Sequence, residues 1–164
     1  MLYSCTGLGA AVAKVEARVT HLFVKPAHGV PMQARAAVDA VEDKGLTGDA
    51  AFGTSRRPVL IIAAPTLAAL DLLPGVIREN ITVSGVAMRG LPRGARIRIG
   101  EVVLEVSGDC TPCEYLESIR PGLRAAIVGQ RGLLTRVARG GELTIGAPVQ
   151  IEPSEAVRQP HADS

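Results

Sequence analysis

Two cysteines three residues apart give the clearest chemical signal in the sequence. They lie in the segment Cys110-Thr111-Pro112-Cys113, which has the spacing of a redox dithiol. Thr111 is suited to cap a helix, and Pro112 is suited to its first position. We therefore expect a short helix over residues 112–120, with Cys113 in its first turn, where unpaired backbone N–H groups and the helix dipole favour a thiolate. A thiolate in this position is suited to attack an electrophile, to carry sulfur or to bind a metal ion.

Other interpretations of these cysteines stay open. A cysteine is often a small buried hydrophobe with no chemical role. A redox dithiol of the thioredoxin kind needs a strand that leads into a helix within a βαβ unit, whereas the residues before Cys110 predict a β-hairpin. One C-x-x-C motif without a second pair of Cys or His residues supplies too few ligands for a structural zinc ion, and His21, His28 and His161 show no ligand spacing.

Charged and polar residues at the ends of expected strands are further candidates for a site. Asp49 follows a glycine in a turn, Arg57 stands directly before an apolar run, and Glu79-Asn80 precedes another. Loops at strand ends are where a rigid scaffold usually places binding residues. No Ser–His–Asp triad and no glycine-rich phosphate loop can be assembled from the sequence.

Short apolar segments, separated by glycine and proline, must position these residues. The clearest is a hairpin in which residues 95–99 and 102–106 alternate around a Gly-Glu turn. Residues 32–42 are ambiguous, because their alanine content favours a helix and their glycine-bounded exit favours an extended segment. Strands are further expected over residues 12–19, 57–64, 81–83, 133–137, 142–145 and 149–151, and helices over 65–73, 112–120 and 123–128. The sequence therefore predicts a mainly β, α+β fold, with a closed or nearly closed β-barrel of mixed short strands and two or three short helices.

The composition limits the classes of protein to which this chain can belong. It has 164 residues, of which 47% are hydrophobic and 2% aromatic, and its 18 basic and 16 acidic side chains give a net charge of +2. This length and apolar content fit one folded domain rather than a disordered chain. The near-neutral charge and the scarcity of aromatic residues disfavour a nucleic-acid partner. No apolar run approaches the roughly 18 residues that a membrane span needs, so no membrane partner is expected.

The chain ends and the cysteine count suggest the organisation and the compartment. We expect a flexible N-terminal segment over residues 1–11, the folded domain over 12–152 and a polar tail over 153–164. The first residues lack the basic start of a signal peptide. Three cysteines are too few for a disulfide-stapled secreted domain, so we expect a reducing, cytoplasmic location.

A series of short motifs runs through the chain in a fixed order. It consists of His28-Gly29-Val30-Pro31-Met32, Gly45-Leu46-Thr47-Gly48-Asp49, Arg57-Pro58-Val59, Pro74-Gly75, Glu79-Asn80-Ile81-Thr82-Val83-Ser84-Gly85, Ile97-Arg98-Ile99-Gly100 and Pro112-Cys113. In this order the motifs resemble the MOSC family, whose members are related to the C-terminal part of molybdenum cofactor sulfurases and also occur as small stand-alone bacterial proteins. The resemblance spans roughly residues 14–151, which is nearly the whole chain.

The resemblance implies a strand-rich barrel with one important cysteine. That residue is Cys113, which would carry sulfur as a persulfide or ligate the molybdenum of a bound molybdopterin cofactor. By position, Asp49, Arg57, Glu79 and Asn80 would line the same pocket. The resemblance also implies that the ambiguous segment, residues 32–42, is extended.

Three positions depart from the family pattern. Ala51 stands where a histidine is usual, Cys110 stands where an arginine is common, and Arg78 stands where a glycine is common. The loss of a basic or imidazole group would weaken binding of an anion. Arg78 and Arg56 are the residues that we expect to compensate.

The leading function is that of a sulfur carrier or sulfurtransferase. Cys113 would accept sulfane sulfur from a donor protein that resembles a cysteine desulfurase and deliver it to a metal centre or a small acceptor molecule. Arg57 and Arg78 would stabilise the anionic ligand, and Cys110 would resolve the persulfide by forming a disulfide. Three alternatives remain, namely a molybdenum-cofactor-binding reductase of N-hydroxylated compounds that works with an electron-transfer partner, a non-catalytic ligand-binding module, and a dithiol redox protein.

Overall fold

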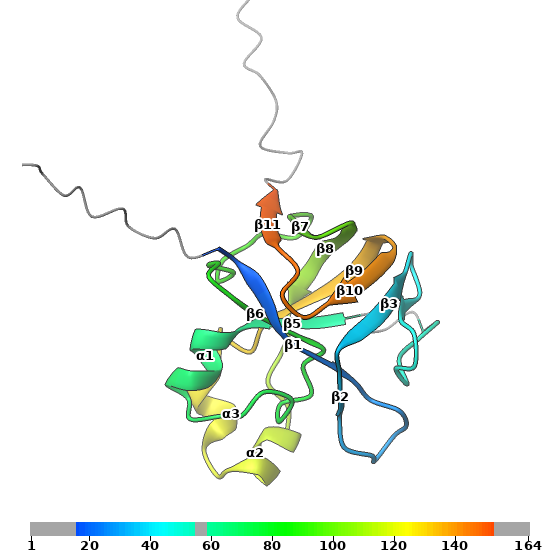
Figure 1. Ribbon diagram of the computed structural model, residues 1–164. Coiled ribbons are helices and arrows are strands. Elements are labelled where there is room, and N and C mark those ends of the chain that lie inside the picture. The colour runs from blue at the N-terminus through cyan, green and yellow to red at the C-terminus, as the bar shows by residue number, and fades with distance from the viewer. Residues whose placement is uncertain (1–15, 55–58, 153–164) are drawn as a thin grey trace, which may run out of the picture.

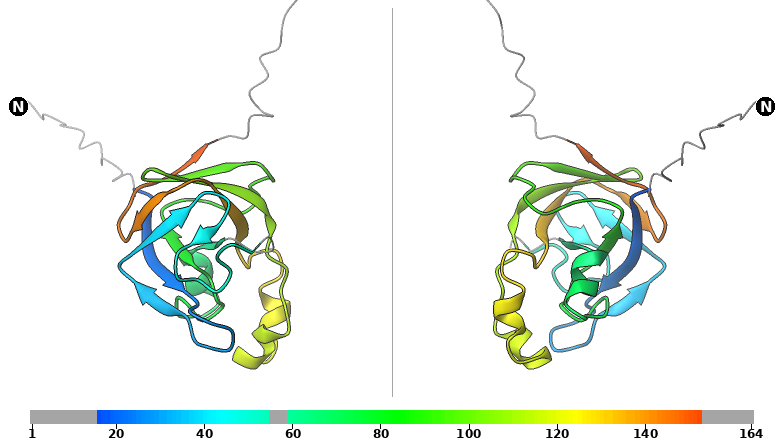
Figure 2. Two further views of the ribbon diagram at one scale, coloured as in Figure 1. Left: turned by 90° about the vertical axis from the view of Figure 1, so that its right-hand side faces the viewer. Right: turned by 90° about the vertical axis from the view of Figure 1, so that its left-hand side faces the viewer.

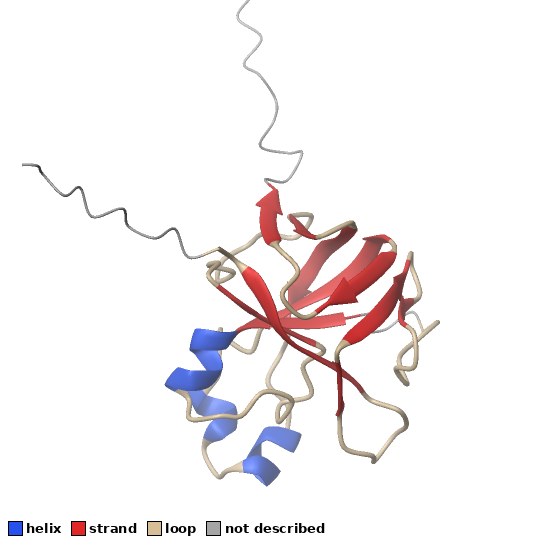
Figure 3. Cartoon of the chain, viewed as in Figure 1, coloured by secondary structure: helices blue, strands red, loops and turns tan. Residues whose placement is uncertain are grey.

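The structure, a computed structural model, describes residues 16–54 and 59–152 (Figure 1). The flexible segment expected over residues 1–11 and the polar tail expected over 153–164 lie outside the described residues, and so do Arg56 and Arg57. The described chain consists of β-strands with short helices gathered on one side (Figure 3).

The strands of the described residues form two sheets. The larger sheet has eight strands in the order β11-β7-β8-β9-β5-β6-β1-β2, and the smaller has three in the order β10-β3-β4. The strands of the larger sheet are β1 (Arg18–Val24), β2 (Gln33–Arg35), β5 (Val59–Ala63), β6 (Ile81–Ser84), β7 (Arg96–Ile99), β8 (Val102–Asp109), β9 (Leu133–Arg139) and β11 (Val149–Glu152). Those of the smaller sheet are β3 (Ala37–Val41), β4 (Gly45–Leu46) and β10 (Gly141–Thr144). The extended conformation that the family resemblance implies for residues 32–42 is therefore confirmed.

The closed barrel expected from the sequence is not confirmed. Ala36 separates β2 from β3, and β3 pairs with β10 and β4 instead of continuing the larger sheet. One isolated bridge joins Arg18 of β1 to Pro148, just before β11. Hydrogen-bonded pairing among the described residues thus leaves two separate sheets, which curve around a shared interior (Figure 2). The mainly β, α+β fold with short helices is confirmed.

One parallel pair of strands determines where the candidate site residues lie. β5 and β6 are parallel, with Ile61 opposite Ile81, and a parallel pair needs a crossover connection. α1 (Ala64–Ala69) and the loop after it provide that connection. Because both strands begin at the same edge of the sheet, Asn80, which precedes β6, lies beside the beginning of β5.

Aliphatic side chains from both sheets fill the interior. The predicted hairpin is confirmed as β7 and β8, in which Ile97 and Ile99 are fully buried and Ile97 faces Leu104. Val38 and Leu143 of the smaller sheet belong to the same core. The interior therefore depends on branched aliphatic residues, as the scarcity of aromatic residues requires.

The helices are short and pack over a second, smaller core. They are α1, α2 (Tyr115–Ile119) and α3 (Leu123–Ala126). None of the helices in the described residues is long and apolar enough to cross a membrane. Their buried residues meet the sheet in a cluster of Ile62, Leu67, Ile77, Leu116, Leu123 and Ile127.

The predicted beginning of the second helix is wrong. α2 begins at Tyr115, its N-cap residue is Glu114, and no side chain caps it, so Thr111 is not a cap and Cys113 is not in the first turn. The cause is a set of contacts that hold the preceding segment against another loop. The backbone N–H of Cys110 donates to the carbonyl of Gly132 at 3.1 Å, and the carbonyl of Thr111 accepts a hydrogen bond from Arg131 at 3.2 Å. The helix-dipole argument for a Cys113 thiolate therefore does not apply.

Candidate functional site

A cavity of about 410 Å³ lies at the edge of the sheet where β5 and β6 begin. We call it the basic cavity, because four basic residues line it. Its lining residues are Lys25, His28, Met32, Asp49, Ala50, Ala51, Thr54, Leu60, Arg78, Asn80, Arg131 and Leu134. Asp49 is the one carboxylate among these described residues, so the cavity carries an excess of positive charge and favours an anionic ligand.

Asp49 and Asn80, which the family resemblance places in one pocket, are in direct contact. Asn80 donates from Nδ2 to Asp49 Oδ2 at 3.0 Å, and Asp49 also accepts from the backbone N–H groups of Lys25 and Ala51, each at 2.9 Å. Asn80 Oδ1 accepts from the N–H of Leu60 at 3.0 Å. Both oxygens of Asp49 are therefore engaged by N–H groups, and the pair joins the ends of β1, β5 and β6 as a rigid wall of the cavity.

Glu79 is placed differently from its neighbour Asn80. It is fully buried, lines neither of the cavities described here, and accepts a hydrogen bond at Oε1 from the N–H of Gly75. Its Oε2 has no hydrogen-bond partner among the described residues. Burial raises the pKa of the Glu79 carboxyl, although hydrogen bonds from backbone N–H groups and the positive charge of Arg131 act in the opposite direction. Glu79 therefore holds the turn before β6 and does not itself line the basic cavity.

The raised pKa predicts that Glu79 makes stability depend on pH. A carboxyl with a higher pKa in the folded state than in the unfolded state binds protons preferentially when the protein is folded. The stabilisation that it contributes to the folded state is therefore present below about pH 4 and is lost as the pH rises through the folded-state pKa. Glu79→Gln should remove this dependence and raise the free energy of unfolding at pH 7 by about 1 kcal/mol. Urea denaturation at pH 4 and pH 7 measures the effect. If Glu79→Gln raises the free energy of unfolding at pH 4 by as much as at pH 7, or by more, the raised pKa of Glu79 is contradicted.

Arg131 forms a buried network that sequence reasoning missed. Its side chain is 3% exposed, and Nη1 donates to Cys110 Sγ at 2.7 Å and to the carbonyl of Thr111 at 3.2 Å. Nη2 donates to the carbonyl of Ile77 at 3.4 Å, whereas Nε has no partner among the described residues. One guanidinium therefore ties the segment after β8 to the loop before β6 and also lines the basic cavity.

A weak signal for Arg131 was present in the sequence. It stands beside Gly132, directly before a predicted strand, as other charged candidates do. Gly132 has a φ of +101°, and a Cβ there would lie 2.5 Å from the carbonyl oxygen of Ile61. Only glycine permits this approach of the loop to β5. The close approach brings Arg131 into contact with the segment that carries the cysteines, and no local sequence pattern predicts this contact.

The two cysteines differ in exposure. Cys110 is 3% exposed and its sulfur is engaged by Arg131, whereas Cys113 is half-buried. Cys113 lines neither cavity, but it lies between Thr111, which contacts Arg131, and Tyr115 of α2. Its carbonyl accepts from the N–H of Leu116 at 3.1 Å. Cys113, which the sequence analysis gives as the reactive cysteine, is therefore the more accessible of the two thiols.

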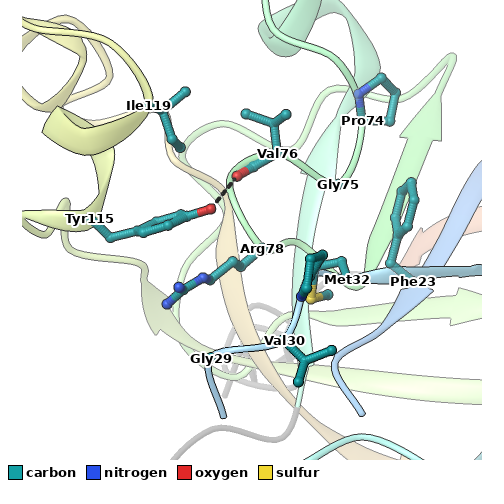
Figure 4. Close-up of a pocket in the computed structure, with 11 residues that line it drawn as sticks. Phe23, Gly29, Val30, Met32, Pro74, Gly75, Val76, Arg78, Tyr115 and Ile119 are labelled. Atoms are coloured by element: carbon teal, nitrogen blue, oxygen red, sulfur yellow. Dashed lines mark hydrogen bonds between the residues drawn. The ribbon is translucent and has the colours of Figure 1, made fainter. Parts of the chain in front are cut away.

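A second cavity of about 520 Å³ adjoins the basic cavity, because Met32 and Arg78 line both. We call it the apolar groove; it is lined by Phe23, Gly29, Val30, Pro31, Met32, Pro74, Gly75, Val76, Arg78, Tyr115 and Ile119 (Figure 4). The guanidinium carbon of Arg78 lies 3.6 Å from the centre of the Tyr115 ring. Asp49 and Asn80 thus line one cavity, as the resemblance implies, and Arg78, which departs from the family pattern, lines it with them. Glu79, which the resemblance also implies, does not line this cavity, and Arg57 lies outside the described residues.

Within the described ranges, 16–54 and 59–152, no three His, Cys, Asp or Glu side chains are grouped so as to hold a metal ion.

Solved structures with the same fold support the fold assignment. YuaD from Bacillus subtilis aligns with a TM-score of 0.73 and 20% identity, over 83% of this chain and 95% of that one. YiiM from Geobacillus stearothermophilus aligns with a TM-score of 0.65 and 19% identity, over 83% and 75% of the two chains. YiiM from Escherichia coli aligns with a TM-score of 0.59 and 20% identity, over 82% and 69%. No curated protein sequence matches this chain.

The family comparison agrees with the ordered motifs and with the fold. The family model of the MOSC domain matches residues 48–150, which include Asp49, Asn80, Arg131 and both cysteines of the C-x-x-C motif. This match covers more than half of the chain. The chain therefore belongs to the MOSC domain family.

Proposed function

We propose that this chain is a sulfur carrier in which Cys113 holds sulfane sulfur beside an anion-binding cavity. The observation that supports this most is the position of the cysteine segment. Arg131 fixes Thr111 from the side of the basic cavity, and Tyr115, two residues after Cys113, lines the apolar groove. The half-buried thiol is therefore carried by a segment that is held against both cavities.

The loading step is a thiol–persulfide exchange. The Cys113 thiolate attacks the outer sulfur of a donor persulfide, the S–S bond of the donor breaks, and the donor leaves as a thiolate. Cys113 then carries one additional sulfur atom. The donor is a protein persulfide of the kind that a cysteine desulfurase presents.

Two routes of release are open to the Cys113 persulfide. An acceptor nucleophile can attack the outer sulfur and leave the Cys113 thiolate behind. Alternatively, the thiolate of Cys110 attacks Cys113 Sγ, which forms a Cys110–Cys113 disulfide and expels hydrosulfide; a dithiol reductant then restores both thiols. The second route requires Cys110 Sγ to leave its hydrogen bond with Arg131.

Incubation of the full chain with glutathione persulfide tests this function. Intact mass spectrometry should show the gain of one sulfur atom, and peptide mapping should place it on Cys113. A protein that gains no sulfur while Cys113 remains reduced would rule out the sulfur carrier.

The charge and size of the basic cavity favour a second candidate function, the binding of a molybdopterin-type cofactor. The residues present fit such a group, because Lys25, Arg78 and Arg131 supply positive charge in a volume of about 410 Å³, within the usual range of cofactor sites. Arg78 and Arg131 would hold its anionic groups, and the Cys113 thiol is a soft metal ligand. When bound, the cofactor would supply metal-centred redox chemistry.

Metal analysis distinguishes the two candidates. Protein purified from a host grown with molybdate should contain molybdenum in proportion to protein if the cofactor is bound, and Cys113→Ala should lose it. If the protein lacks molybdenum and still loads sulfur on Cys113, the sulfur carrier is favoured over the cofactor-binding reductase.

A further inference from the structure

The apolar groove has the properties of a small-molecule site of its own. Its volume of about 520 Å³ lies within the usual range of ligand pockets. Tyr115 and Ile119 of α2 form one side, Phe23 and Met32 lie on the other, and Arg78 extends beneath the Tyr115 ring (Figure 4). Among the described residues that line the groove, Arg78 is the only charged one. The groove therefore combines an apolar surface with a single positive charge.

The Arg78 guanidinium is arranged to receive an anion. Its central carbon lies over the Tyr115 ring, 3.6 Å from the ring centre, and the guanidinium forms no hydrogen bond or ion pair with another described residue. Tyr115 is itself held, because its hydroxyl donates to the carbonyl of Val76 at 3.1 Å. Stacking fixes the plane of a guanidinium and leaves the N–H groups at its edge free, which is the geometry that binds a carboxylate through two hydrogen bonds.

The backbone at Arg78 also indicates that its side chain has a role. Arg78 has a φ of +65°, in the left-handed region that glycine adopts readily and arginine does not. The other described non-glycine residues with positive φ, Asp43 and Asp71, are of a type that tolerates this region better. A disfavoured residue at the junction of two cavities is typical of a functional position.

We infer that the apolar groove binds a small molecule with an apolar body and one anionic group, and that Arg78 pairs with this group. A ligand with several negative charges fits the basic cavity better, because three further basic residues line it. A ligand with a single charge and an apolar tail fits the groove, where the tail covers Val30, Val76 and Ile119 and one guanidinium meets the charge. This inference does not depend on sulfur transfer at Cys113.

Three probes test the inference by isothermal titration calorimetry: 4-phenylbutyrate, its neutral amide 4-phenylbutyramide, which has nearly the same shape, and butyrate, which keeps the charge but lacks the phenyl ring. The full chain should bind 4-phenylbutyrate about tenfold more tightly than either of the other two. Equal binding of the acid and its amide would overturn the role of Arg78, and equal binding of the acid and butyrate would overturn the role of the apolar surface.

Two substitutions separate the charge from the fold. Arg78→Gly should reduce 4-phenylbutyrate affinity about tenfold without lowering the thermal midpoint, because glycine relieves the left-handed backbone. Val30→Glu places a negative charge on an exposed groove residue that does not line the basic cavity. It should weaken binding of 4-phenylbutyrate but not binding of its neutral amide. If either variant keeps the wild-type preference for the acid, the ligand is bound elsewhere and the inference fails.

Matched controls account for strain and for net charge. Asp71→Gly relieves a positive φ of +54° at an exposed residue that lines neither cavity, and Arg124→Ala removes an exposed positive charge on α3. Both variants should bind 4-phenylbutyrate as the wild type does. Because none of these variants alters Cys113, sulfur loading can be measured on the same proteins and judged separately.

Discussion

Cys113→Ser should abolish the sulfur adduct that the wild-type chain forms with a persulfide donor. The serine hydroxyl is not ionised at neutral pH and cannot displace the donor thiolate, whereas its size and its place before α2 are nearly unchanged. Loading should fall to background, while the thermal midpoint stays close to that of the wild type, because the Cys113 side chain is half-buried and lies outside the core clusters. Intact mass spectrometry and differential scanning fluorimetry measure the two quantities.

The other cysteines provide the controls for this result. Cys110 is buried and engaged by Arg131, so Cys110→Ser should still load sulfur and should release hydrosulfide more slowly if Cys110 resolves the persulfide. Cys5, which lies outside the described residues, can be replaced by serine as a second control and should load as the wild type does. Equal loading of the wild type and Cys113→Ser would refute the assignment of Cys113.

The largest loss of stability is expected from Arg131→Met. Methionine retains much of the apolar stem but removes the hydrogen bonds to Cys110 Sγ and to two backbone carbonyls, and it removes the positive charge that acts on buried Glu79. The free energy of unfolding should fall by about 3 kcal/mol, as is typical when one member of a buried charge network is removed. Urea denaturation followed by circular dichroism gives this value. A loss below about 1 kcal/mol would show that the network contributes little.

A double variant tests whether Arg131 compensates the charge of Glu79. In an Arg131→Met background the buried carboxylate lacks a nearby cation, so Glu79→Gln should recover more stability there than it gives in the wild type, with a coupling of about 1 kcal/mol. Additive effects would mean that Arg131 acts only through the hydrogen bonds that it donates. Arg124→Met, on the exposed surface of α3, is the matched control and should change stability by no more than about 0.5 kcal/mol.

The elements that the sequence predicted well are those with strong local patterns. The alternation in residues 95–99 and 102–106 is satisfied within one hairpin, so its register follows from a short segment of chain. Residues 32–42 are different, because their alanine content is compatible with two structures and the choice is made by pairing with β1 and β10. Only the family resemblance gave the right answer there.

The features that the sequence did not predict depend on contacts between distant segments. α2 begins later than its Thr-Pro signal suggests, because Gly132 and Arg131 bind the backbone of residues 110–111 and keep it out of the helix. The meeting of Asp49 with Asn80 was expected from the resemblance alone, and the participation of Arg131 was not expected at all. An arginine whose side chain bonds to a distant loop leaves no periodic pattern in the sequence of its own loop.

The central position of β5 affects how the protein folds as it is synthesised. β5 lies between β6, which follows it closely in sequence, and β9, whose Thr135 pairs with Val59. While a ribosome is still translating residues before β9, β5 has one unpaired edge that is rich in branched aliphatic residues and open to other chains. Folding of the larger sheet must therefore wait until β9 has emerged, and the nascent chain should be most prone to aggregation during that interval.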